Sequence, residues 1–194
     1  MRHFKTAILV VSVLLTAALS VQAQEKKMEM PKPGPEVKKL GYFVGTWTSE
    51  GELKENPFGM PAGKMTSTDK CEWFTGGYSV ICHTAGKGPM GAMHGIGIIG
   101  YSTEDKVYTY YGVDNSGYAG LSKGKIDGNS WVFTSDEKMG GKAFHGRYSM
   151  DTASPDSYTF KYETSEDGQK WTTVMQGKTT KAGGAEKKAP AEKK

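Results

Sequence analysis

The chain has 194 residues, 37% of them hydrophobic, and a formal net charge of +4. This length fits one folded domain, and beyond the first 23 residues no segment is apolar enough to cross a membrane as a helix. The charge is uneven, because the segment 40–177 carries twelve Lys or Arg against sixteen Asp or Glu, whereas 178–194 carries six Lys and two Glu. The positive total is therefore no argument for nucleic-acid binding by the folded part.

The first 23 residues have the pattern of a secretory signal peptide. Arg2 and Lys5 precede an apolar run from Ala7 to Leu19, and Val21-Gln22-Ala23 places small residues where a signal peptidase cleaves. The run is shorter than the ~20 residues that a membrane span requires. We therefore expect cleavage after Ala23 and export to the periplasm or beyond the cell, with no membrane span.

The two ends of the predicted mature chain have compositions typical of unfolded segments. Residues 24–39 are rich in Lys, Glu and Pro, and we interpret them as a flexible lead-in. Residues 182–194 form a Lys/Ala-rich tail that lacks apolar side chains to bury, so we expect disorder. Such a tail is most simply solubilising, and it would make at most weak contact with anionic envelope surfaces. The folded domain is then residues 40–181.

The body of the chain reads as a series of strands, because aromatic and β-branched residues cluster in short runs separated by turn dipeptides. No helical period interrupts the series. Regular spacing with tight turns predicts an all-β protein, a single antiparallel up-and-down β-barrel whose closure removes exposed edges. About ten strands are expected, near 46–54, 64–75, 78–85, 92–101, 106–114, 117–126, 129–136, 141–151, 157–165 and 169–180.

Turn chemistry gives an expected register for three hairpins. A loop at Asp167-Gly168 would pair Phe160 with Met175, and a loop at Asp127-Gly128 would set Trp131 over Gly124. The turn at 102–105 joins two strands and places seven of their residues on one face. We expect this face to point inward because it is the more apolar of the two. Its residues are His94, Ile96, Ile98, Val107, Thr109, Tyr111 and Val113.

The predicted interior is aromatic, with small residues such as Gly120, Ser122 and Gly124 between the rings. These side chains either fill a solid core or line a cavity for an apolar or amphipathic ligand, and periodicity does not separate the two. The predicted barrel lining is Trp47, His94, Tyr111, Trp131, Phe133, Phe160, Tyr162, Trp171 and Met175.

The only two cysteines lie in the stretch "CEWFTGGYSVIC", at positions 71 and 82. If Gly76-Gly77 forms a two-residue loop, Cys71 directly faces Cys82 across the strands, at a separation that a disulfide bridges. Export makes oxidation the expected state. A metal site would need two further ligands, and a redox pair is more typically Cys-x-x-Cys at a helix start, so a Cys71–Cys82 disulfide is predicted.

Several blocks of the sequence resemble a bacterial family of small secreted proteins described only as a domain of unknown function. They are "GPEVKKLGYFVGTWTSEGEL", "CEWFTGGYSVIC", "GYSTEDKVYTYYGVD", "KMGGKAFHGRYSM" and "SYTFKYETSEDGQKWTTVMQGK". The resemblance covers roughly residues 34–181. Gly45-Thr46-Trp47 is also similar to the Gly-x-Trp signature that opens the first strand of lipocalin-like (calycin) barrels. This wider group, which includes the fatty-acid-binding proteins, implies small-molecule binding inside the barrel.

Haem or metal binding through His94 is a weaker alternative. Some related ten-stranded barrels hold haem through a histidine near the chain end, and the segment 157–180 has none. His83, His94 and His145 form no metal-binding spacing, so a structural role is the default for His94. The Gly-x-Gly-x-x-Gly string at 86–91 precedes a strand pattern rather than the helix that phosphate binding requires.

No catalytic pattern is found, since most acidic residues sit at turns where turn chemistry explains them. We therefore expect no enzyme and no cofactor. The sequence favours an exported protein that holds an apolar or amphipathic small molecule in an aromatic-lined barrel. The alternative is an envelope-interaction protein with a solid barrel whose basic tail makes the contacts.

Overall fold

A computed structural model describes residues 32–183 of the chain. The predicted signal peptide, residues 24–31 of the lead-in and residues 184–194 of the tail lie outside the described residues. Within the described part, no helix has the length and apolar character needed to cross a membrane.

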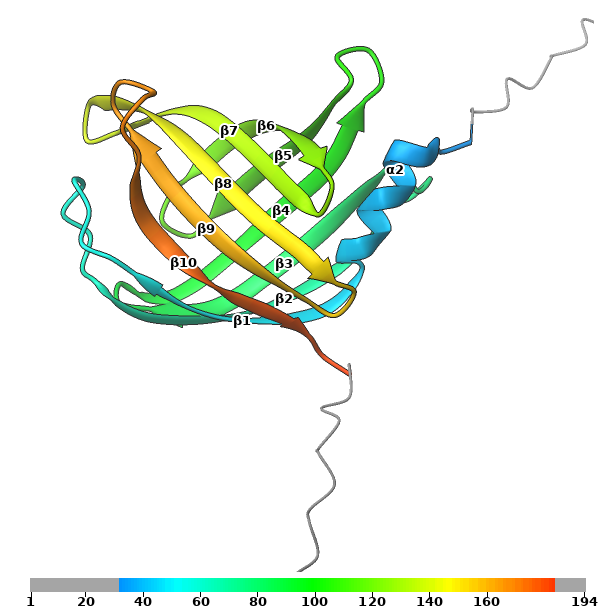
Figure 1. The fold of residues 1–194 in the computed structure, drawn as a ribbon. Coiled ribbons are helices and arrows are strands. Elements are labelled where there is room, and N and C mark those ends of the chain that lie inside the picture. Colours follow the sequence, from blue (N-terminus) through cyan, green and yellow to red (C-terminus); the bar gives the residue numbers. More distant parts are fainter. Residues whose placement is uncertain (1–31, 184–194) are drawn as a thin grey trace, which may run out of the picture. The chain divides into compact units, whose positions relative to one another are not determined.

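Ten antiparallel strands follow two short helical segments. Each strand pairs with the next in sequence, and the first pairs with the last, so the sheet closes into a barrel (Figure 1). The predicted all-β fold of ten strands is confirmed, and each strand begins and ends within about three residues of its expected position. The elements are α2 (Pro35–Lys39), η2 (Leu40–Phe43), β1 (Gly45–Leu53), β2 (Gly63–Trp73), β3 (Ser79–Gly88), β4 (Gly91–Ser102), β5 (Val107–Asp114), β6 (Ala119–Asp127), β7 (Ser130–Met139), β8 (Lys142–Ser154), β9 (Ser157–Ser165) and β10 (Thr172–Lys181).

Alternation along each strand shows which side chains point into the barrel. On β1, Trp47 and Ser49 are buried whereas Thr48 and Glu50 are exposed, the period of two that a half-buried strand requires. The cross-strand register carries this alternation around the barrel. Trp47, for example, lies opposite Asp69 on β2, which lies opposite Thr84 on β3.

A short helical segment closes one end of the barrel, where Figure 1 shows α2 lying across the strand ends. The last residues of the predicted flexible lead-in, 35–39, are therefore helical, because Val37 gains a buried position that composition alone does not reveal. Leu40 and Phe43 on η2 are buried with it, and the Trp47 indole Nε1 donates a 2.7 Å hydrogen bond to the Phe43 carbonyl.

Aromatic rings fill the barrel beneath this helix. The Phe43 and Trp131 ring centroids are 4.9 Å apart in an edge-to-face pair, and those of Tyr108 and Trp131 are 5.1 Å apart. Tyr42 packs beside Trp47 at 5.4 Å. Such pairs stabilise a core beyond their buried area, so the helix end of the barrel is solid.

The disulfide between Cys71 and Cys82 is present, as predicted from the facing positions around Gly76-Gly77. The two residues are Cα partners in the β2–β3 ladder, and Trp73 faces Val80 as expected. Both sulfur-bearing side chains are buried.

The other hairpin registers differ from those predicted. Asp127 pairs with Ser130, so the loop is Gly128-Asn129, and Phe133 rather than Trp131 faces Gly124. This shift of two in the pairing keeps the same side chains on the same face.

The hairpin after β9 departs further, because Asp167 forms a wider loop. Its Oδ1 accepts hydrogen bonds from the backbone N–H groups of Gln169 and Lys170 and from the Ser165 hydroxyl. A bulge at Val174 then changes the register again, and Met175 pairs with Tyr162 instead of Phe160.

The face predicted to point inward on β4 and β5 points outward. Ile96, Ile98 and Tyr111 are 39%, 40% and 45% exposed, whereas Ile99 and Tyr108 on the opposite face are buried. The inward face is less apolar in sequence because it contains Gly97 and Gly112. Both glycines lack a side chain and so leave room for the Tyr110 ring. The rule that the more apolar face points inward is wrong for this strand pair for that reason.

Candidate functional site in the barrel interior

An acidic side chain stands at the middle of the barrel interior. Asp69 on β2 shares the inward face with the buried residues Ser67 and Cys71. The hydroxyl of Thr84, its cross-strand partner, donates a 2.5 Å hydrogen bond to Asp69 Oδ1. Asp69 takes part in none of the ion pairs found among residues 32–183, so no basic side chain in this part of the chain neutralises it. A carboxyl group in this setting has unused hydrogen-bonding capacity.

Burial shifts the pKa of Asp69. Removal from water raises this pKa above its ordinary value, and the Thr84 hydrogen bond opposes part of the increase. Burial disfavours the charged form of any acid that has no compensating cation. Asp69 is thus a carboxyl group that would gain from a partner with a positive charge or a hydrogen-bond donor.

Three tyrosines share the barrel interior with this carboxyl group. Tyr110 on β5, Tyr148 on β8 and Tyr158 on β9 point inward, and the pKa of each hydroxyl is raised first by burial and further by the charge of Asp69. The hydroxyls are therefore neutral at physiological pH and available as hydrogen-bond donors. The charge of one carboxyl group thus acts on tyrosines from three separate strands.

Side chains in the middle of the barrel keep some accessible surface. Tyr110, Tyr148 and Tyr158 are only half-buried although they point into the interior. Within the described part, the Tyr110 and Tyr148 hydroxyls have no hydrogen-bond partner. Every fully buried side-chain polar atom in that part does have a partner, so these two hydroxyls are not fully buried. Both hydroxyls consequently keep some accessible surface. We call the interior between the aromatic helix end and the opposite mouth the chamber.

Glycines on the wall make room for the rings of the chamber. A Cβ on Gly97 would stand 2.7 Å from Tyr110 Cε2, and one on Gly177 would stand 2.6 Å from Phe160 Cζ. A Cβ on Gly124 would be equally close to the Phe133 ring. Any larger residue would push these rings into the chamber, so glycine at these positions helps to set its shape.

A second polar cluster lies toward the mouth, the end opposite α2. Glu137 Oε1 accepts hydrogen bonds from the Ser135 hydroxyl at 2.5 Å and the Tyr162 hydroxyl at 3.2 Å. A Cβ on Gly146 would stand within 3 Å of all three groups, so the glycine makes space for them. Burial, with a smaller effect from Glu137, raises the pKa of Tyr118 to about 12.

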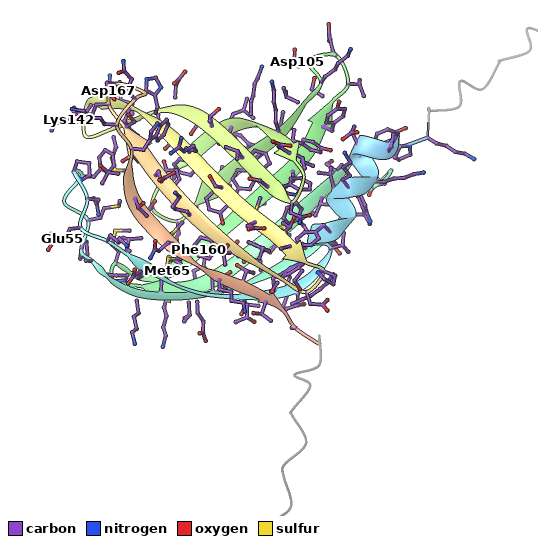
Figure 2. All side chains as sticks on the ribbon, in the orientation of Figure 1. Glu55, Met65, Asp105, Lys142, Phe160 and Asp167 are labelled. Atoms are coloured by element: carbon purple, nitrogen blue, oxygen red, sulfur yellow. A yellow bond between two sulfur atoms is a disulfide. The ribbon has the colours of Figure 1, made fainter. Side chains whose placement is uncertain are left out.

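The loop between β1 and β2 covers part of the mouth. Its Phe58 ring packs on Phe144 of β8, with centroids 4.6 Å apart. Asn56 organises the loop, because its side chain accepts hydrogen bonds from the Phe58 and Met60 N–H groups and donates to the Lys54 and Met60 carbonyls. Figure 2 shows Glu55 of this loop at the same end of the barrel as Lys142 and Asp167.

The structure brings six of the nine predicted lining residues inside the barrel. Trp47 and Trp131 belong to the solid aromatic end, and Tyr162 belongs to the mouth cluster. Phe133 and Phe160 are inward and buried, and Met175 packs against the core. Contact of any of them with a ligand stays a prediction.

The other three predicted lining residues lie on the outer face. His94 and Tyr111 are exposed because β4 and β5 have the opposite orientation from the prediction. Trp171 precedes β10, where the wide Asp167 loop places its ring under the outward guanidinium of Arg147, 4.0 Å from Cζ to the ring centroid.

Asp69, Thr84, Tyr110 and Tyr148 were not among the residues predicted from the sequence. The predicted Cys71–Cys82 pairing contained the signal for the first two, because the same register places Asp69 opposite Thr84 on the cysteine face. Tyr110 was missed because the predicted orientation of β5 is wrong.

His94 lines a groove on the outer face, about 590 Å³ in volume, with His83 and Ile96. A larger outer groove of about 760 Å³ crosses β1, β10 and β9 beside Glu50, Lys161 and Gln176. Within residues 32–183, no three His, Cys, Asp or Glu side chains come together as a metal site. A haem or metal bound inside the barrel through His94 is contradicted by its outward position.

A closed antiparallel barrel, with a helix across one end and a lined chamber in the middle, is a lipocalin-like β-barrel. Residues 32–181 match the family described as "Protein of unknown function (DUF1579)", and the chain belongs to this family.

The comparison with solved structures supports the fold alone. Rv2717c from M. tuberculosis is similar with a TM-score of 0.56 at 11% identity, over 77% of this chain and 99% of that one. A second structure, EF1p2_mFAP2b bound to DFHBI, has a TM-score of 0.42 at 11% identity, over 75% of this chain and 98% of the other. That likeness is too distant to carry an argument. No curated protein matches the sequence.

Proposed function

We propose that this protein binds a small amphipathic molecule in the chamber and carries out no chemistry on it. The observation that carries the proposal is the set of deep, inward tyrosines that keep accessible surface, Tyr110, Tyr148 and Tyr158. Concave sites lined by aromatic rings with a few polar groups are typical of small-molecule binding. The rings would supply contact area, while the hydroxyls and Asp69 would orient the polar part of the ligand.

We also propose that the protein works outside the cytoplasm. The signal-peptide pattern of residues 1–23 supports export, and the Cys71–Cys82 disulfide fits an oxidising compartment. Binding without catalysis would suit a carrier or scavenger of its ligand in that compartment.

The direct test is to identify a bound molecule. The mature protein is purified without detergent and examined by native mass spectrometry, and the ligand-free form is titrated with alkyl probes while Trp fluorescence is recorded. We expect a bound mass, or saturable quenching. Absence of both, for probes with acidic, neutral and basic head groups, would show that the proposal is wrong.

Two adjacent tyrosines provide a matched pair of variants. Tyr110→Leu removes an inward ring from the chamber, whereas Tyr111→Leu removes an outward ring one residue along the same strand. We expect Tyr110→Leu to weaken probe binding about tenfold, the usual cost of deleting a central aromatic contact, and Tyr111→Leu to leave it unchanged. Equal effects would place the binding site elsewhere, and circular dichroism checks that both variants are folded.

A further inference from the structure

Two carboxylates point into the barrel away from its ends or toward the mouth. Asp69 is at the middle and Glu137 toward the mouth, and both belong to the inward sets of their strands. Two basic side chains occupy inward strand positions of the described barrel: Lys142 is exposed at the mouth end of β8, and the ammonium nitrogen of Lys181 lies 5.1 Å from the Trp47 ring centroid at the helix end. The basic residues Arg147 and Lys161 lie on the outer face, paired with Glu163.

We propose that the ligand of this barrel is an organic cation, a protonated amine or quaternary ammonium with an apolar chain, and that Asp69 holds its positive end. This inference rests on the binding function proposed above. Asp69 has no cationic partner among the described residues, and its one side-chain hydrogen bond comes from Thr84. Aromatic rings that surround a carboxylate form the usual receptor for an ammonium group, because ring faces attract cations.

The neighbours of Asp69 favour a cation over an anion. Thr84 on β3 is hydrogen-bonded to it, and its charge acts on the inward tyrosines Tyr110, Tyr148 and Tyr158, all of them neutral hydroxyls on rings. A fatty-acid carboxylate would meet an acidic group there that is paired with no basic side chain, since the inward Lys181 lies on the opposite side of Trp47 from Asp69 in the strand register. An ammonium group would instead supply the missing charge and reverse the burial cost of the Asp69 carboxylate.

The apolar part of the ligand would lie toward the mouth or along the inner wall. Phe133 and Phe160 are buried inward rings of the wall, and Met65 and Met93 lie beside Gly88 near the mouth. Thioether side chains adapt to chains of varied shape. The chamber would therefore recognise the charged end closely and the apolar end loosely.

Three probes with the same chain separate the possibilities: decyltrimethylammonium, decanol and decanoate, each titrated below its micelle concentration into the mature protein. We expect the ammonium probe to bind at least about tenfold more tightly than the other two. Asp69→Asn keeps the shape and the Thr84 contact but removes the charge, so this preference should disappear. Glu72→Gln is the control, because Glu72 is exposed on the other face of the same strand.

Probe affinity measured over a pH series on the unmodified protein gives a second test, which does not depend on whether the variant folds. The quaternary probe keeps its charge, so its affinity should fall as pH decreases from about 8 to about 4, as Asp69 takes up a proton, while decanol binding stays level. Three outcomes overturn the cation assignment but leave the binding function standing. They are equal binding of the three probes, an ammonium affinity that does not change with pH, and an unchanged ammonium preference in Asp69→Asn. Failure of all three probes to bind overturns both.

Discussion

The hydroxyl of Tyr108 on β5 donates a 2.5 Å hydrogen bond to the Glu36 carboxylate on α2, and so links the closing helix to the barrel wall. The same hydroxyl lies 3.2 Å from the Glu36 backbone carbonyl. The hydrogen bond from Lys39, and then that from Tyr108, lower the pKa of Glu36. A five-residue helix has little stability of its own, so such tertiary contacts hold it in place.

Removal of this link should loosen the helix without unfolding the barrel. We expect Tyr108→Phe to increase hydrogen exchange of the amides in residues 35–43, measured by mass spectrometry on peptides of the folded protein. Tyr101→Phe is the control, because its ring packs on Tyr108 at 4.9 Å but its hydroxyl makes no hydrogen bond in the described part. Equal protection in all three proteins would show that the link is not needed.

The Glu36 contact also predicts a pH dependence. Because the folded-state pKa of Glu36 is lowered, its contribution to stability is present above the ordinary carboxyl pKa and is lost as pH falls through the lowered value. The difference in exchange between wild type and Tyr108→Phe should therefore shrink in acid. A difference that grows as pH falls would contradict this.

The Cys71–Cys82 disulfide should stabilise the β2–β3 hairpin. It joins residues only 11 apart in sequence, and the Gly76-Gly77 turn already brings them together. We expect the Cys71→Ala, Cys82→Ala double variant to lose about 2 kcal/mol of unfolding free energy in urea, toward the low end for disulfides. Peptide mapping without reductant checks the premise, since a free thiol at either position in the exported protein would refute it.

The strand series was predictable because it depends on local signals. Glycine-containing turns and β-branched or aromatic runs gave ten strands, and the Gly76-Gly77 turn fixed the register that joins Cys71 to Cys82. Closure followed, since a long meander of strands avoids exposed edges by joining its ends.

The lining of the chamber was less predictable because inward and outward faces were judged by hydrophobicity. On β4 and β5 this criterion failed, since the ring of Tyr110 occupies the space left by Gly97 and Gly112 while Ile98 and Tyr111 remain outside. Pairing of glycines with large rings across strands is a tertiary relationship that one strand does not reveal. Asp69 was likewise missed, because a lone carboxylate in a strand resembles a solvent-facing residue until its register is known.

The contact between glycine and aromatic ring predicts a strong effect at Gly177. A Cβ there would come within 2.3 Å of the Glu50 carbonyl oxygen and 2.6 Å of Phe160 Cζ. The first neighbour is backbone and has little freedom to move, so we expect Gly177→Ala to cost about 2–3 kcal/mol in urea unfolding. Gly34→Ala is the control, because a Cβ at Gly34 meets nothing within 4 Å. A neutral Gly177→Ala would show that the β1–β10 contact can open.

The outer face of β8 and β9 carries a buried ion pair. The Glu163 side chain is 8% exposed and accepts 2.8 Å contacts from both Arg147 and Lys161. Burial by itself would raise the pKa of Glu163, but the hydrogen bonds from these two cations outweigh it and the pKa is lowered. The Arg147 guanidinium also lies over the Trp171 ring.

Replacement of this carboxylate should therefore cost stability at neutral pH and much less in acid. We expect Glu163→Gln to lose about 1 kcal/mol near pH 7, because Arg147 and Lys161 keep partial access to water that limits the loss. The folded-state pKa is lowered, so the stabilisation is complete above the ordinary carboxyl pKa and disappears as pH falls through the lowered value. Urea unfolding at several pH values measures this stabilisation, with the exposed Glu50→Gln as control.

Trp171 fluorescence should change with Glu163→Gln and not with the control, because only Glu163→Gln alters the carboxylate that holds the Arg147 guanidinium above the Trp171 ring. A loss of stability that persists unchanged in acid would mean that Glu163 acts through packing rather than charge.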